Sequence, residues 1–102
     1  IALIDEYRAV VCIACESAVY EKMVSNLQEI RARKGKIIVI ATDGDEKIKE
    51  QSKEVIYIPK CNELFSPLLV ALPLQLVAYN IAAKRGCDVD QPRNLAKSVT
   101  VE

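Results

Sequence analysis

The chain has 102 residues, of which 51% are hydrophobic and 27% charged, as expected for one folded domain rather than a disordered segment. Fourteen basic side chains balance fourteen acidic ones, which argues against a nucleic-acid-binding surface. There is no histidine, so imidazole acid–base chemistry and histidine metal ligands cannot come from this chain. We therefore expect neither a metal site nor a cofactor.

The chain begins with the apolar run IALI, and the first residue is Ile1 rather than Met. No positively charged segment precedes this run, so the pattern does not predict a signal peptide. We expect the chain to be a fragment of a longer protein.

Three short runs rich in β-branched residues predict strands at residues 9–15, 36–42 and 54–60. The first two are nearly continuous apolar runs, which are typical of parallel strands covered on both faces. The first contains Cys12 and Cys15 at the spacing of a redox or metal pair. Residues three apart in a strand point to opposite faces, so we expect buried, reduced thiols, as in the cytosol.

Between the first two strands, apolar side chains recur at helical spacing, at Tyr20, Met23, Val24, Leu27 and Ile30. Ser17 is a suitable N-cap, and Gly35 stands where a helix stop is expected. Strand, helix and strand predict a βαβ unit with a right-handed crossover.

The stretch DGDEKIKEQSKE begins at Asp43, and Asp43-Gly44 is a turn signal. We expect one short solvated helix there. Acidic residues that follow a strand can also bind a metal ion or a ribose. Because no glycine-rich phosphate loop accompanies them here, a solvated surface is favoured over such a binding site.

Residues 64–83 carry no charge and are long enough to span a membrane. We expect a helix capped at Asn62 or Glu63, kinked by Pro73 and stopped at Gly86. Because this apolar segment follows short buried strands, burial in a core or a subunit interface is favoured over a membrane. The pattern predicts an α/β fold with a three-stranded parallel sheet and helices on both faces, which is only part of a domain.

The final segment, DVDQPRNLAKSVTVE, places Arg93 and Lys97 four residues apart. Asp88, Asp90 or an anionic ligand would offset the repulsion between these two positive charges. Each aspartate is also suited to a capping hydrogen bond or to an ion pair. A lysine beside a second cation and partly removed from water has a lowered pKa, and its neutral amine can form a Schiff base with a carbonyl. A solvated basic pair remains the alternative.

This final segment resembles the C-terminal signature of the family of isomerising glutamine–fructose-6-phosphate aminotransferases, also called glucosamine-6-phosphate synthases. The preceding PLQLVAYNIAAKRGCDVD and the opening IALID resemble the same family, so the match runs from end to end. The resemblance implies the later part of a sugar isomerase (SIS) domain at residues 1–86 and an active-site tail at residues 87–102.

The resemblance also implies roles for three tail residues. Lys97 forms the Schiff base with the open-chain sugar, Ala96 lines the sugar site through its backbone, and Arg93 lies close to the catalytic groups. The implied ligands are fructose 6-phosphate and glucosamine 6-phosphate, with ammonia supplied from glutamine. Members of the family work as dimers, so the resemblance implies a homodimer. From the resemblance together with the cysteine usage and the charge balance, we expect a cytoplasmic protein with no nucleic-acid or membrane partner.

Other implied parts of the site lie upstream of this chain: a glutaminase domain, a first SIS domain with a phosphate cradle, a proton-moving glutamate and a histidine. We therefore expect the fragment alone to be inactive. A non-catalytic SIS module that binds a phosphosugar to regulate another protein is the alternative function.

Overall fold

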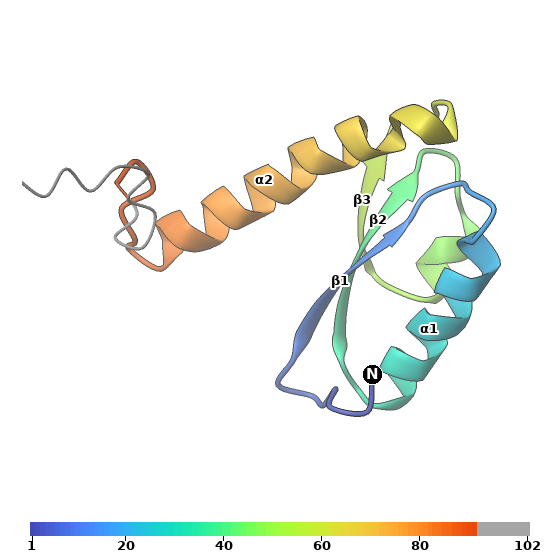
Figure 1. Ribbon diagram of the computed structural model, residues 1–102. Helices are drawn as coiled ribbons and strands as arrows, with labels where there is room; N and C mark the ends of the chain where they lie inside the picture. The colour runs from blue at the N-terminus through green and yellow to red at the C-terminus, as the bar shows by residue number, and fades with distance from the viewer. Residues whose placement is uncertain (92–102) are drawn as a thin grey trace, which may run out of the picture. The chain divides into compact units, whose positions relative to one another are not determined.

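The structure is a computed structural model that describes residues 1–91 of the chain. Its elements follow in the order β1 (Ala9–Ala14), α1 (Tyr20–Ala32), β2 (Lys36–Thr42), η1 (Lys47–Glu50), β3 (Glu54–Ile58), η2 (Glu63–Phe65) and α2 (Ser66–Lys84), as Figure 1 shows. The η elements are short 3-10 helices. The chain divides into two compact units, Ile1–Val70 and Ala71–Glu102.

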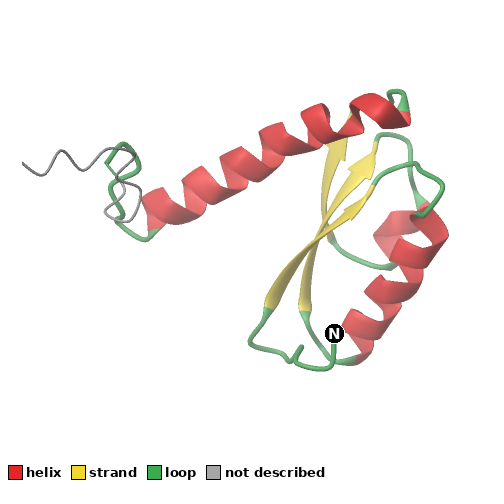
Figure 2. Ribbon diagram, in the orientation of Figure 1, coloured by secondary structure: helices red, strands yellow, loops and turns green. Residues whose placement is uncertain are grey.

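The three strands form one parallel sheet in the order β1-β2-β3 (Figure 2). Cys12 pairs with Val39 in the register of β1 and β2, and Val39 pairs with Val55 in that of β2 and β3. The predicted α/β class and the three parallel strands are confirmed. The bounds of β2 match the prediction, whereas β1 and β3 end earlier, at Ala14 and Ile58.

The core of the first unit lies between α1 and one face of the sheet. It contains alternate residues of the strands, two residues of α1 and one of η1: Cys12, Ala14, Leu27, Ile30, Ile37, Val39, Ala41 and Ile48. Burial of each large aliphatic side chain contributes roughly 1.5–3 kcal/mol.

The two strands predicted to be buried on both faces, β1 and β2, differ in how exposed their side chains are. In β2, Val39 and Ile40 point to opposite faces, and both are fully buried. In β1, Val11 and Ile13 are 40% and 44% exposed. The reason is that β1 is an edge strand and α1 covers the face that carries Cys12 and Ala14.

The predicted cap of α1 is wrong. Val19, not Ser17, is the N-cap, and it makes no side-chain cap hydrogen bond. The backbone carbonyl of Ser17 instead accepts a 3.2 Å hydrogen bond from the Tyr20 backbone N–H, so residues 17–20 form a turn that enters the helix.

The C-terminal end of α1 also differs from expectation at Gly35. The left-handed residue is Lys34, with φ of 61°, and Gly35 follows it. The backbone N–H of Gly35 donates to the carbonyl of Ile30, which completes a Schellman-type ending. There is no room for a side chain at Gly35, because a Cβ there would lie 2.6 Å from Ile4 Cγ2 and 2.9 Å from Ile30 Cγ2.

The start of the long apolar helix follows the prediction. The Asn62 side chain accepts a 3.0 Å hydrogen bond from the Leu64 backbone N–H, which caps η2. Pro73 lies inside α2 and removes one backbone hydrogen bond without ending the helix.

The end of α2 also follows the prediction. The helix ends at Lys84, and Gly86 takes the left-handed φ of 72°. The backbone N–H groups of Gly86 and Cys87 donate to Ala83 and Ala82, in the Schellman pattern.

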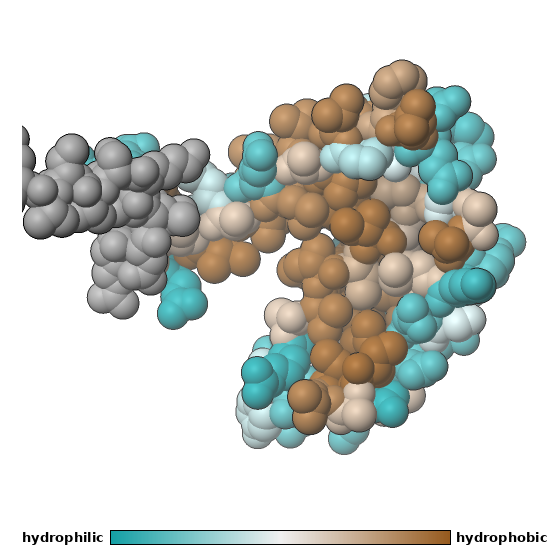
Figure 3. Space-filling model, in the orientation of Figure 1, coloured by the Kyte–Doolittle hydropathy of each residue, from teal (hydrophilic) through white to brown (hydrophobic). Residues whose placement is uncertain are grey.

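The apolar side chains of α2 are largely exposed (Figure 3). Leu68, Leu72 and Leu76 are 69%, 59% and 63% exposed, whereas Val70 is buried. Burial of the whole helix in a core is therefore not observed among the described residues, and a subunit interface stays a prediction. By length and composition alone, Glu63–Lys84 could cross a membrane, with a mean hydropathy of 1.7. A buried helix of a soluble protein can pass the same test, so this is weak evidence for a membrane.

Candidate functional site

A polar cleft lies where the three strands end, which is the usual ligand-binding edge of a parallel α/β sheet. Its volume is about 430 Å³. The lining comes from the segments after the strands and from the first turns of two helices: Glu16, Tyr20, Thr42, Asp43, Gly44, Asp45, Lys47 and Lys60. The acidic segment predicted to be a solvated surface thus forms part of a concave surface.

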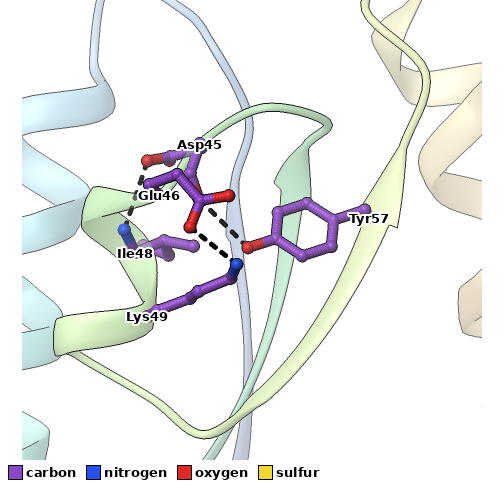
Figure 4. Close-up of polar contacts among 5 residues, drawn as sticks. All are labelled: Asp45, Glu46, Ile48, Lys49 and Tyr57. Atoms are coloured by element: carbon purple, nitrogen blue, oxygen red, sulfur yellow. Dashed lines mark hydrogen bonds and ion pairs between the residues drawn. The ribbon is translucent and has the colours of Figure 1, made fainter.

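Asp45 organises one side of this cleft (Figure 4). Its carboxylate accepts hydrogen bonds from the Tyr20 hydroxyl at 2.6 Å and from the Ile48 backbone N–H at 3.2 Å. Its backbone carbonyl accepts a 3.0 Å hydrogen bond from the Tyr57 hydroxyl. Asp45 therefore joins α1, η1 and β3, and the sequence reasoning missed this role.

The same contacts change the acidity of Tyr20. Burial raises the pKa of its hydroxyl well above the ordinary value, and the adjacent Asp45 carboxylate raises it further. Tyr20 is therefore a hydrogen-bond donor at neutral pH rather than a base.

The other side of the cleft joins the ends of the strands. The Glu16 backbone N–H donates to Thr42 Oγ1 at 2.8 Å, which ties the end of β1 to the end of β2. The Lys60 ammonium, after β3, lies 2.9 Å from a Glu16 carboxylate oxygen. This ion pair is exposed and salt-screened, so it positions the rim more than it stabilises the fold.

Cys12 and Cys15 are buried and unpaired with each other, which confirms the interpretation of core thiols for this pair. Burial raises the pKa of both thiols, and for Cys15 a hydrogen bond with Thr42 partly offsets the increase. Raised pKa values keep them protonated and unreactive. Cys61 is half-buried and Cys87 is exposed, so burial of every cysteine is not observed.

The cleft has the groups of a binding surface rather than a reaction centre. Two hydroxyl groups line it, and both are engaged: Tyr20 donates to Asp45, and Thr42 accepts a hydrogen bond from the Glu16 backbone N–H. The Asp45 carboxylate accepts from two donors. Across residues 1–91 no group of three or more histidine, cysteine, aspartate or glutamate side chains could hold a metal ion.

The tail residues predicted to be catalytic or sugar-binding, Arg93, Ala96 and Lys97, lie outside the described residues. Their roles therefore stay predictions. Just before them, the Asp88 carboxylate accepts 3.0 Å hydrogen bonds from the backbone N–H groups of Asp90 and Gln91. Asp88 thus has the capping role that was one of its predicted alternatives.

Curated relatives match this chain along its whole length. It is 58% identical over 102 residues to the glutamine–fructose-6-phosphate aminotransferase (isomerizing) of Thermus thermophilus, and 57% identical over 102 residues to that of Aquifex aeolicus. In both cases the match covers 100% of this chain and 17% of the relative. A protein of the same name from Sphingobium yanoikuyae is 52% identical over 103 residues, with 66% of its length covered.

A solved structure shows the same fold. The C-terminal domain of glucosamine-fructose-6-phosphate aminotransferase from Francisella tularensis matches with a TM-score of 0.74 and 31% sequence identity. The match covers 86% of this chain and 25% of that structure. Residues 1–85 match the SIS domain family. The chain therefore belongs to the SIS domain family.

Proposed function

We propose that this chain is the C-terminal part of the isomerase domain of an enzyme that makes glucosamine 6-phosphate from fructose 6-phosphate and glutamine. The observation that carries the proposal is 58% identity across all 102 residues, tail included, with an aminotransferase named for this reaction. The chain spans only 17% of that relative. In this proposal a glutaminase domain and a first SIS domain form the rest of the protein.

In this proposal the amine of Lys97 attacks the C2 carbonyl of open-chain fructose 6-phosphate. The carbonyl oxygen leaves as water, and a Schiff base joins Lys97 to C2. Ammonia released from glutamine then displaces the lysine amine, and an enzyme carboxylate moves a proton from C1 to C2, which gives the aldose. Arg93 favours the neutral amine by charge repulsion, and the backbone of Ala96 lines the sugar site.

The chain alone is inactive in this proposal, because the proton-moving carboxylate and the phosphate cradle belong to the rest of the protein. The complete enzyme is a cytoplasmic homodimer that needs no cofactor, membrane or nucleic acid. A reducing cytoplasm is supported by the free thiols of Cys12 and Cys15, which do not pair in the fold.

The second candidate is a SIS module that binds a phosphosugar without reacting with it, and membership of the SIS family favours it equally. An assay of the complete protein separates the two. The aminotransferase forms glucosamine 6-phosphate, and Lys97→Arg lowers this activity by roughly 10³-fold or more while glutamine hydrolysis continues. Binding of fructose 6-phosphate with no amino-sugar product would instead establish the regulatory module.

A further inference from the structure

Asp88 lies at the start of the tail, between the end of α2 and Lys97. Its carboxylate oxygen Oδ1 accepts 3.0 Å hydrogen bonds from the backbone N–H groups of both Asp90 and Gln91. A carboxylate oxygen has two lone pairs, so one atom holds both donors, and its charge strengthens each hydrogen bond. Residues 88–91 are therefore held together in one turn by a single side chain.

This turn continues directly from the end of α2. The backbone N–H groups of Gly86 and Cys87 donate to carbonyls of the last turn of the helix, and Gly86 takes a left-handed φ of 72°. At the other end of the turn, Gln91 precedes Pro92, and a residue before proline has few backbone conformations open to it. The path of the chain from α2 to Gln91 is therefore fixed by backbone hydrogen bonds, a glycine and the Asp88 carboxylate.

Burial does not hold the turn in place, because Asp88, Asp90 and Gln91 are exposed. Within residues 1–91 the ion pairs join other side chains, so charge pairing does not hold it either. The two hydrogen bonds to the Asp88 carboxylate are therefore what closes the turn. A short exposed segment without such bonds samples many backbone conformations, and each conformation sends the following chain in a different direction.

We propose that Asp88 is a positioning residue for the aminotransferase reaction. By closing the turn, it sets the direction in which the tail leaves α2, and so brings the Lys97 amine to the sugar carbonyl. This inference rests on the proposed function, and Asp88 itself touches no reacting atom. Because the phosphate cradle in the rest of the protein binds the sugar, loss of the turn slows Schiff-base formation without weakening sugar binding.

Two substitutions in the complete protein separate the capping oxygen from the charge. Asp88→Ala removes the acceptor and should lower kcat for glucosamine 6-phosphate formation about three- to thirtyfold, as loss of a cap predicts, with KM for fructose 6-phosphate within about twofold of native. Asp88→Asn removes the charge but retains Oδ1 as an acceptor, so it should keep at least about half of the native kcat.

The matched control is Asp90→Ala, in the same turn. Within residues 1–91 the Asp90 side chain accepts no hydrogen bond, and its backbone N–H, the group that Asp88 binds, remains in the variant. Asp90→Ala therefore removes one negative charge without opening the turn, and kcat should change less than about twofold.

Timed borohydride trapping with fructose 6-phosphate distinguishes a displaced lysine from a smaller folded fraction. In Asp88→Ala the adduct on Lys97 should form more slowly than in the native protein but reach the same final extent. A purely structural role would instead lower the final extent and leave the rate unchanged, because the molecules that remain folded would react normally.

Three results would overturn the inference in a native protein that is active: a native kcat in Asp88→Ala, an equal loss in Asp88→Asn or Asp90→Ala, or a lower extent of trapping at an unchanged rate. A native protein that forms neither the amino sugar nor the adduct would contradict the proposed function itself, and the role of Asp88 would fall with it.

Discussion

The hydroxyl of Tyr20 donates a 2.6 Å hydrogen bond to the carboxylate of Asp45, which joins the first turn of α1 to the loop after β2. The two residues are 25 positions apart in the chain. This contact fixes the entry of the βαβ helix against the cleft at the carboxyl ends of the strands.

Loss of this contact should destabilise the fold. Tyr20→Phe removes a hydrogen bond to a charged acceptor, so we expect the free energy of unfolding to fall by about 1.5–3 kcal/mol. Asp45→Ala should cost more, because Asp45 also accepts from the Ile48 backbone N–H. Urea denaturation followed by circular dichroism measures both. The control is Asp43→Ala, at an exposed position, with a change within about 0.5 kcal/mol.

The raised pKa of Tyr20 predicts a loss of stability in alkali. Since the folded-state pKa lies above the ordinary value of 10.0, the folded chain retains a proton that the unfolded chain releases. The contribution of Tyr20 to stability is therefore constant below pH 10 and falls as the pH rises beyond it, whereas the buried thiols of Cys12 and Cys15, with raised pKa values, add a fall that begins near their ordinary value of 9.0. Denaturation midpoints measured from pH 8 to 11 should show this fall, and Tyr20→Phe should reduce it. An identical alkaline profile in the variant would contradict the assignment.

The end of α1 offers a matched pair of glycine substitutions. Lys34→Gly relieves a left-handed conformation at φ 61° and should stabilise the chain by about 1 kcal/mol. Gly35→Ala should destabilise it by about 1–3 kcal/mol, because the new Cβ crowds Ile4 and Ile30. Thermal unfolding of the two variants should shift in opposite directions. If the unfolding temperatures of both variants shifted in the same direction, the left-handed Lys34 and the close packing at Gly35 would be contradicted.

Thiol reactivity should follow exposure. Cys87 is exposed and should react first with an aromatic disulfide reagent at neutral pH, followed by the half-buried Cys61. Cys12 and Cys15 should react only on unfolding, because burial raises their pKa values and blocks access. Mass spectrometry of timed samples gives the order. Rapid oxidation of Cys12 and Cys15 to a disulfide in the folded chain would restore the redox interpretation.

Much of the fold was predictable, because its signals are local. The β-branched run of β2 marks that strand from Lys36 to Thr42, and Gly86 marks the end of α2. The exposure of Val11 was not predictable, since an apolar run does not reveal which strand lies at a sheet edge.

The cleft was harder to predict than the strands. The acidic segment after β2 has the composition of a solvated loop, and no local pattern connects Asp45 with Tyr20 and Tyr57. That connection depends on the βαβ topology, which brings the start of α1, η1 and β3 to the same edge. The roles of Arg93, Ala96 and Lys97 rest on resemblance and identity alone.

The most direct test of the proposed function is reductive trapping on the complete protein. Borohydride added with fructose 6-phosphate should reduce a Schiff base and leave a sugar adduct on Lys97, identified by peptide mass spectrometry. Lys97→Arg should show no adduct at that position. A stable adduct on Lys97 of the native protein is the predicted result. An enzyme that forms glucosamine 6-phosphate without any adduct at Lys97 would contradict the proposed mechanism.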